Sequence, residues 1–77
     1  MSDRVNFEIT KRFSVIGENP KTHWTREVNE VSWNGGKPKV DIREWDPEHV
    51  KMSRGCTFTK DEAMELQKIL NQMYPPY

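Results

Sequence analysis

Indole rings and cations are interleaved along one short stretch of the chain, from Trp33 to Trp45. The stretch that follows the turn at 34–36 is typical of a β-strand, in which alternate side chains point to the same face. One face would then carry three cations and an indole: Lys37, Lys39, Arg43 and Trp45. Trp33 before the turn, with Lys51 and Arg54 after this strand, would extend the same track. Flat rings stack on unpaired bases and cations neutralise phosphates, so this pattern suits a single nucleic-acid strand.

Side chains that could make or break bonds are few and scattered. The only imidazole and thiol groups are those of His23, His49 and Cys56, and no zinc-ligand pair such as CxxC or HxxxH occurs. No pattern supports a Cys-His nucleophile pair, and Cys56 is expected to pack in a strand beneath a helix. The carboxylates at 41, 44, 46 and 48 have Arg43 and Lys51 as neighbours, which favours a solvated or salt-bridged edge over an acid–base pair. We therefore predict no catalytic residue, no metal ligand and no cofactor, in a chain that is not an enzyme.

Composition limits the class of protein further. Lys and Arg together number 12, and Asp and Glu also number 12, so the formal net charge is zero. Proteins that capture duplex DNA by bulk electrostatics usually carry a clear basic surplus, so a local basic stripe is the expected form of any nucleic-acid site. A chain of 77 residues, 34% of them hydrophobic, predicts one domain over 1–77 with a thin core that self-association would enlarge.

Targeting signals are not evident. No apolar run is long enough to span a membrane, and the N-terminal residues lack the apolar stretch of a signal peptide. A single cysteine fits a reducing compartment. We therefore expect a soluble, cytoplasmic protein with no membrane partner, and association with the nucleoid as one form of that location if the chain binds DNA.

Alternation of apolar and polar residues predicts four strands, over 7–16, 22–34, 37–45 and 50–58. In the first, Lys11 interrupts the apolar side and indicates a bulge or a site facing a partner. In the second, the alternation breaks between Val28 and Val31, which predicts a bend or bulge. In the third, Val40 and Ile42 form the face expected in the core.

Two glycine positions and one capped helix complete the pattern. Asn34-Gly35-Gly36 is a tight-turn signal, and Gly55 indicates a kink or a close approach in the fourth strand. Thr59 and Glu62 form a capping box for a helix that Pro75-Pro76 would end. Its apolar stripe comprises Ala63, Leu66, Ile69, Leu70 and Met73. We expect an α+β fold, a four-stranded antiparallel sheet followed by one C-terminal helix that covers one sheet face. The other face would be solvated, paired with a second subunit or used for binding.

Three runs along the chain resemble the C-terminal domain of the transcriptional positive cofactor 4 family: KVDIREW, DPE and KMSRGCTFTKDEAMELQKIL. The short lead and the run REVNEVSWN resemble its compact bacterial, YdbC-like branch, and the similarity covers roughly residues 7 to 73. The resemblance implies a strongly curved β-β-β-β-α fold. It also implies a homodimer whose sheets form channels for single-stranded DNA, with little sequence preference.

Residue by residue, the resemblance implies stacking by Trp33 and Trp45 and basic contacts from Lys37, Arg43 and Arg54. The chain departs from the family pattern in having one aromatic, Trp45, where the coactivator has two, and at two further positions. Ser53 replaces a further cation, and Asn34 lacks the charge expected at the hairpin. Fewer phosphate contacts and a weaker salt dependence are therefore expected.

Residues and resemblance together predict sequence-tolerant binding of single-stranded DNA, with single-stranded RNA as a second candidate. The role would lie in transcription regulation, replication or repair, with proteins of those processes as further partners. Seven residues are expected to contact the strand: Trp33, Lys37, Lys39, Arg43, Trp45, Lys51 and Arg54. The alternative is a dimeric protein-interaction module of the transcription machinery, with Trp33 and Trp45 as anchors. A third hypothesis is a small enzyme that uses His49 or Cys56.

Overall fold

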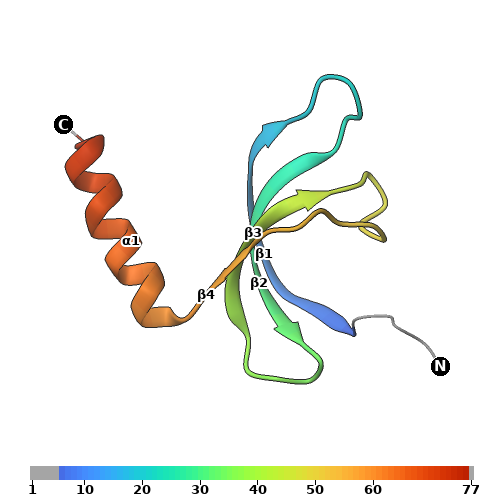
Figure 1. Cartoon of the computed structure of the whole chain (residues 1–77), viewed down its shortest axis with the longest axis horizontal. Coiled ribbons are helices and arrows are strands. Elements are labelled where there is room, and N and C mark those ends of the chain that lie inside the picture. The colour runs from blue at the N-terminus through green and yellow to red at the C-terminus, as the bar shows by residue number, and fades with distance from the viewer. Residues whose placement is uncertain (1–5, 77) are drawn as a thin grey trace.

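Four antiparallel strands and one C-terminal helix make up the fold in a computed structural model that describes residues 6–76 (Figure 1). The elements are β1 (Phe7–Glu18), β2 (Thr25–Trp33), β3 (Lys39–Trp45), β4 (Cys56–Phe58) and α1 (Lys60–Met73). The sheet has the order β1-β2-β3-β4, and each strand is antiparallel to its neighbour. The predicted β-β-β-β-α fold class is confirmed.

β4 is much shorter than the strand predicted over 50–58. The carboxylate of Asp46 accepts hydrogen bonds from the backbone N–H groups of Val50 at 2.8 Å and Lys51 at 2.9 Å. In a longer β4 these two N–H groups could pair with the neighbouring strand, but here they bond to Asp46 and close a loop. The chain therefore meets β3 at one isolated bridge, between Met52 and Trp45, before β4 begins.

The glycine signals are confirmed. Asn34 and Gly35 both have positive φ angles, of 52° and 74°, as the predicted tight turn requires. A Cβ atom at Gly55 would collide with the Cβ of Arg43 and with the carbonyl oxygen of Ile42. At Gly55, the segment before β4 thus passes close to the backbone of β3.

β2 and β3 pair in continuous register, which defines two faces of the sheet. Residues directly opposite each other point to the same side. One side, called the inner face from here on, is made by Thr25, Glu27, Asn29 and Val31 of β2 with Lys39, Asp41, Arg43 and Trp45 of β3. β2 itself carries no bulge, because Val28 and Val31 lie on opposite faces of a strand that pairs with β3 without a register shift.

The core lies on the inner face. Its fully buried hydrophobic side chains are Val31 and Trp45. Val40 and Ile42 point to the opposite, outer face and are only partly buried, as is Phe58, which pairs with Val40. The prediction that Val40 and Ile42 form the core is wrong, because the helix does not cover the outer face.

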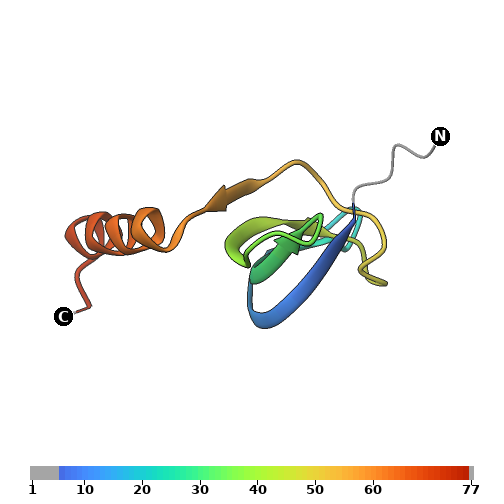
Figure 2. The ribbon, with the colours of Figure 1, turned by 90° about the horizontal axis from the view of Figure 1, so that it is seen from below.

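β1 is an edge strand that follows β2 through three bulges. The extra residues are Thr10, Phe13 and Ile16. The bulge predicted at Lys11 is confirmed, since the first register shift falls between Ile9 and Lys11. The bulges redirect the following side chains and contribute to the curvature of the sheet (Figure 2). Phe13 and Ile16 consequently stay 62% and 59% exposed.

α1 begins with the predicted capping box. The N–H of Glu62 donates to Thr59 Oγ1 at 3.1 Å, and the N–H of Thr59 donates to Glu62 Oε1 at 2.9 Å. The helix extends away from the sheet (Figures 1 and 2), and none of its residues is buried. The expectation that it covers a face of its own sheet is wrong, and Cys56 is exposed rather than packed beneath it. Within residues 6–76, no helix has the length and apolar character needed to cross a membrane.

Candidate nucleic-acid interface

Arg43, predicted to contact phosphates, is held by its own strand. Its Nε and Nη2 atoms donate to the two carboxylate oxygens of Asp41 at 2.7 and 2.8 Å, and its side chain is only 13% exposed. Asp41 is fully buried and accepts a further hydrogen bond from Thr57 Oγ1 at 3.0 Å. A buried carboxylate needs such partners because an unpaired buried charge is costly. Arg43 is therefore part of a buried ion pair rather than the free cation that was expected.

Trp33 is partly exposed, and its ring is fixed from two directions. The guanidinium carbon of Arg43 lies 4.4 Å from the centre of the indole, a cation–π contact. The ring of Phe7 lies beside it, with centres 5.9 Å apart and planes inclined at 47°. Trp33 thus offers a ligand the remaining surface of an indole that is already held in place.

Trp45 is fully buried, contrary to the expectation that its indole is available to bases. Phe7 packs against it with ring centres 5.2 Å apart, and His49 stacks on it at 5.7 Å with planes 22° apart. The loop after β3 explains this burial, because His49 adopts a left-handed conformation, with φ 58°, in the segment that brings its ring onto the indole. Trp45 is a core residue here, and an imidazole occupies its stacking face.

The remaining predicted contacts are exposed cations: Lys37, Lys39, Lys51 and Arg54. Within residues 6–76, none of them forms an ion pair with a carboxylate. Lys37 and Lys39 follow the β2–β3 turn, at the end of the sheet that carries Trp33. Arg54 precedes Gly55, whose backbone lies against Arg43. Three of the four therefore belong to segments adjoining the Trp33–Arg43 pair, whereas Lys51 lies earlier in the β3–β4 loop than Arg54.

A polar network that the sequence did not predict is centred on Glu27, which is 5% exposed. Its carboxylate accepts hydrogen bonds from the Thr25 hydroxyl and from Asn29 Nδ2 at 3.1 Å, and it pairs with His49 Nε2 at 2.9 Å. Burial raises the pKa of Glu27, but these hydrogen bonds and the charge of His49 outweigh burial and hold the pKa below its ordinary value. The Asn29 side chain, also buried, accepts a hydrogen bond from the N–H of Phe13 at 3.3 Å.

One signal in the sequence points to this network. Thr25, Glu27 and Asn29 occupy alternate positions of β2, so they share a face in any strand. Alternation separates two faces but does not tell which of them is covered. A polar set is usually expected to be solvated, and only the tertiary structure shows that this one is enclosed.

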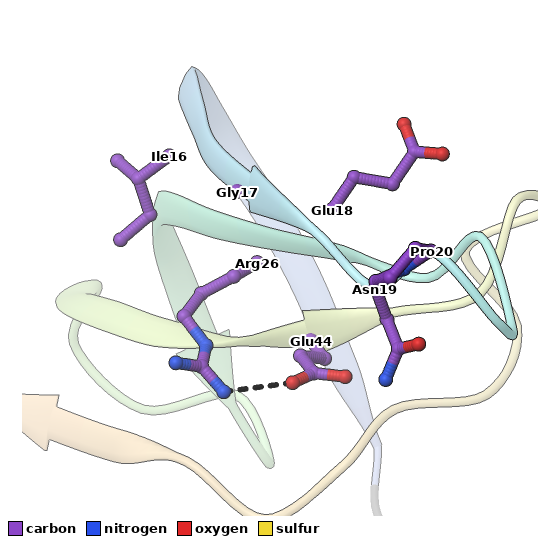
Figure 3. A pocket seen from close by; sticks show the side chains of 7 residues that line it. All are labelled: Ile16, Gly17, Glu18, Asn19, Pro20, Arg26 and Glu44. Atoms are coloured by element: carbon purple, nitrogen blue, oxygen red, sulfur yellow. Dashed lines mark hydrogen bonds and ion pairs between the residues drawn. The ribbon is translucent and has the colours of Figure 1, made fainter.

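A second charged site lies at the far end of the sheet and does not contribute to the interface. Arg26 and Glu44 pair across β2 and β3 at 2.7 Å beside a cavity of about 380 Å³ (Figure 3). Glu18 and Asn19, close to the β1–β2 turn, also line this cavity. The positive charge of Arg26 is balanced by Glu44, and Glu18 adds a second carboxylate to the lining. The cavity is therefore poorly suited to phosphate.

Comparison with known proteins places the chain among its relatives. The sequence matches the family described as Transcriptional Coactivator p15 (PC4) over residues 21–69. It is also similar to a protein of Treponema pallidum (strain Nichols), itself described as uncharacterized, with 34% identity over 73 residues. That similarity covers 95% of this chain and 85% of the relative. The family match begins just before β2 and ends within α1, so it includes the Trp33–Arg43 pair and the exposed cations.

Proposed function

Since this chain belongs to the Transcriptional Coactivator p15 (PC4) family, which is known for single-stranded DNA binding and coactivator roles, we propose that it binds single-stranded DNA with little sequence preference. The observation that carries the proposal is that the matched segment holds an ordered indole–guanidinium pair together with four exposed cations. Binding of single-stranded RNA and a role in transcription regulation, replication or repair belong to the same proposal. The domain would extend over residues 1–77, and it would carry out no chemistry on the strand.

In the proposed complex, the exposed cations contact phosphates and Trp33 meets a base. Trp33 suits this role because Arg43 and Phe7 fix its ring before binding, which reduces the entropy lost on association. Arg43 acts mainly by positioning the indole, since Asp41 already balances its charge. Trp45 supports the inner face from the core.

The salt dependence of binding follows from the number of free cations. Each phosphate neutralised on a single strand changes the slope of log K against log salt by about −0.7, so Lys37, Lys39, Lys51 and Arg54 together predict a slope of about −2.8. The double variant Lys37→Gln/Lys39→Gln should reduce the slope to about −1.4. Lys21→Gln is the matched control, because it removes an exposed cation from the β1–β2 turn, at the other end of β2.

The deciding experiment is a titration of oligo-dT, its RNA counterpart and the matching duplex at several salt concentrations. Tighter binding of the single strands, with the slope given above, supports the proposal. Equal or tighter binding of the duplex would overturn it. Binding to none of the three would favour the protein-interaction module instead.

We also propose that the chain forms a homodimer through surfaces that it leaves uncovered. Ile69, Leu70 and Met73 of α1 are 50%, 45% and 59% exposed. Ile69 also lines an apolar groove of about 420 Å³, together with Phe58 and Leu66. A second copy could bury this groove and the outer face of the sheet together, which would add to a thin core.

Light scattering in solution tests the dimer. The wild-type chain should have the mass of two copies at micromolar concentration, and Leu70→Glu should shift it toward one copy, because a buried unpaired charge is costly at an interface. Lys68→Glu, an exposed change on the same helix, is the control. A wild-type chain with the mass of one copy would contradict the proposal.

A further inference from the structure

We infer that a cavity between β1 and the β3–β4 loop is a subsite for one unstacked nucleobase; this rests on the proposed function. The cavity has a volume of about 280 Å³, and its lining includes Arg12, Phe13, Ser14, Glu27, Asn29 and His49. None of these residues belongs to the seven contacts expected from the sequence. The subsite would extend the binding surface beyond the Trp33–Arg43 pair toward the opposite end of the inner face.

A β-bulge places the aromatic side chain of this cavity. Phe13 is the extra residue of the second bulge of β1, between the pairs Arg12–Asn29 and Ser14–Val28. Bulges of this kind redirect a side chain and often occur beside functional sites. The ring of Phe13 is 62% exposed although it lines a cavity, so one side of it is open to a flat ligand.

A series of partly buried hydrogen bonds connects Phe13 to the imidazole on the other side of the cavity. The N–H of Phe13 donates to Asn29 Oδ1 at 3.3 Å, and Asn29 Nδ2 donates to Glu27 Oε1 at 3.1 Å. Glu27 in turn pairs with His49 Nε2 at 2.9 Å, and His49 stacks on Trp45. A connected hydrogen-bond network of this kind restrains the residues that it joins. It therefore holds the bulge and the imidazole at fixed positions before any ligand binds.

The lining selects the chemistry of the ligand. The cavity is slightly smaller than typical small-molecule pockets, so it suits one flat group. Phe13 offers a stacking surface, and His49 keeps Nδ1 for a hydrogen bond because Nε2 is engaged by Glu27. Arg12 is an exposed cation at the same cavity. An anion alone would face the buried carboxylate of Glu27, whereas a nucleotide can place its base in the cavity and its phosphate outside near Arg12.

The test compares Phe13→Ala with Ile16→Ala, a substitution at the next bulge of β1, which lines a different cavity and is similarly exposed. Each variant is titrated with oligo-dT and with an abasic oligomer of the same length, which keeps the phosphates and lacks the bases. Phe13→Ala should weaken oligo-dT binding by roughly 5- to 150-fold, the range for loss of one stacked base, and should leave the abasic affinity unchanged. Phe13→Tyr should restore binding, and Ile16→Ala should behave as the wild type.

The outcomes separate this inference from the proposed function. Wild-type binding of oligo-dT with no loss in Phe13→Ala would overturn the nucleobase subsite and leave the proposed function intact. An equal loss for oligo-dT and the abasic oligomer would also overturn it, because phosphates alone would then account for the effect. A wild-type chain that binds no single strand would overturn both. Circular dichroism of each variant confirms that the fold is retained before its affinity is compared.

Discussion

Replacing Arg43 with alanine should destabilise the fold before it reports on nucleic-acid binding. The substitution leaves the carboxylate of Asp41, which is 0% exposed, with the Thr57 hydroxyl as its remaining side-chain donor. Removing one partner of a buried ion pair costs about 3–5 kcal/mol. A chain of this length has a total stability of about 4–12 kcal/mol. Arg43→Ala should therefore lose a large fraction of the free energy of unfolding.

Urea unfolding followed by tryptophan fluorescence measures the loss. With a slope of about 1–3 kcal/mol per M urea, the midpoint should fall by at least about 1 M. Arg26→Ala is the control. It breaks the ion pair with Glu44, whose N–O distance is also 2.7 Å, but the side chain of Arg26 is 58% exposed. Its expected cost is below about 1 kcal/mol, because water screens an exposed pair.

A double variant separates the charge effect from packing. Asp41→Leu with Arg43→Met removes both charges together and should recover most of the stability lost in Arg43→Ala. Equal midpoints for Arg43→Ala and Arg26→Ala would refute the argument that burial makes the Asp41–Arg43 pair costly to break. Binding measured with Arg43→Ala needs correction for the folded fraction, which makes Lys37 and Lys39 better positions for testing phosphate contacts.

Two further predictions concern Glu27 and Gly55. Because the pKa of Glu27 is lowered in the folded chain, its ionised form stabilises the fold above its ordinary pKa, and that contribution is lost as the pH falls through the lowered value. The free energy of unfolding of Glu27→Gln, measured with urea, should thus decline less than that of the wild type between about pH 6 and about pH 3; parallel declines would contradict this. Gly55→Ala should cost about 1–3 kcal/mol, since the new Cβ would collide with β3. Gly17→Ala, whose Cβ meets no atom within 4 Å, is the control, and equal thermal midpoints would count against the close approach.

Local signals in the sequence predicted local structure well. The capping box of Thr59 and Glu62 and the positive φ angles at Asn34 and Gly35 formed as expected. Each depends on bonds or steric limits within about four residues, so it is independent of the rest of the fold. The bulge at Lys11 was predictable for a similar reason, because it interrupts the alternation of its own strand.

The candidate site was predicted only in part. Lys37, Lys39 and the partly exposed Trp33 are where the alternation along 37–45 and the turn before it place them. Trp45 and Arg43 share the predicted face as well, but that face carries the core. The loop that brings His49 onto Trp45 depends on hydrogen bonds to Asp46, and nothing in the spacing of these residues shows where the loop ends.

The sequence by itself determined the order of the elements, the turn, the helix cap and the division of each strand into two sets of side chains. It also carried the family resemblance. Only the tertiary structure decided which set is enclosed, and the outcome is unusual because Glu27, Asn29 and Asp41 are buried while Val40 and Ile42 are not. The physical reason is that alternation follows from the geometry of one strand, whereas burial depends on segments distant in sequence: β1, the β3–β4 loop, and a helix that leaves the outer face uncovered.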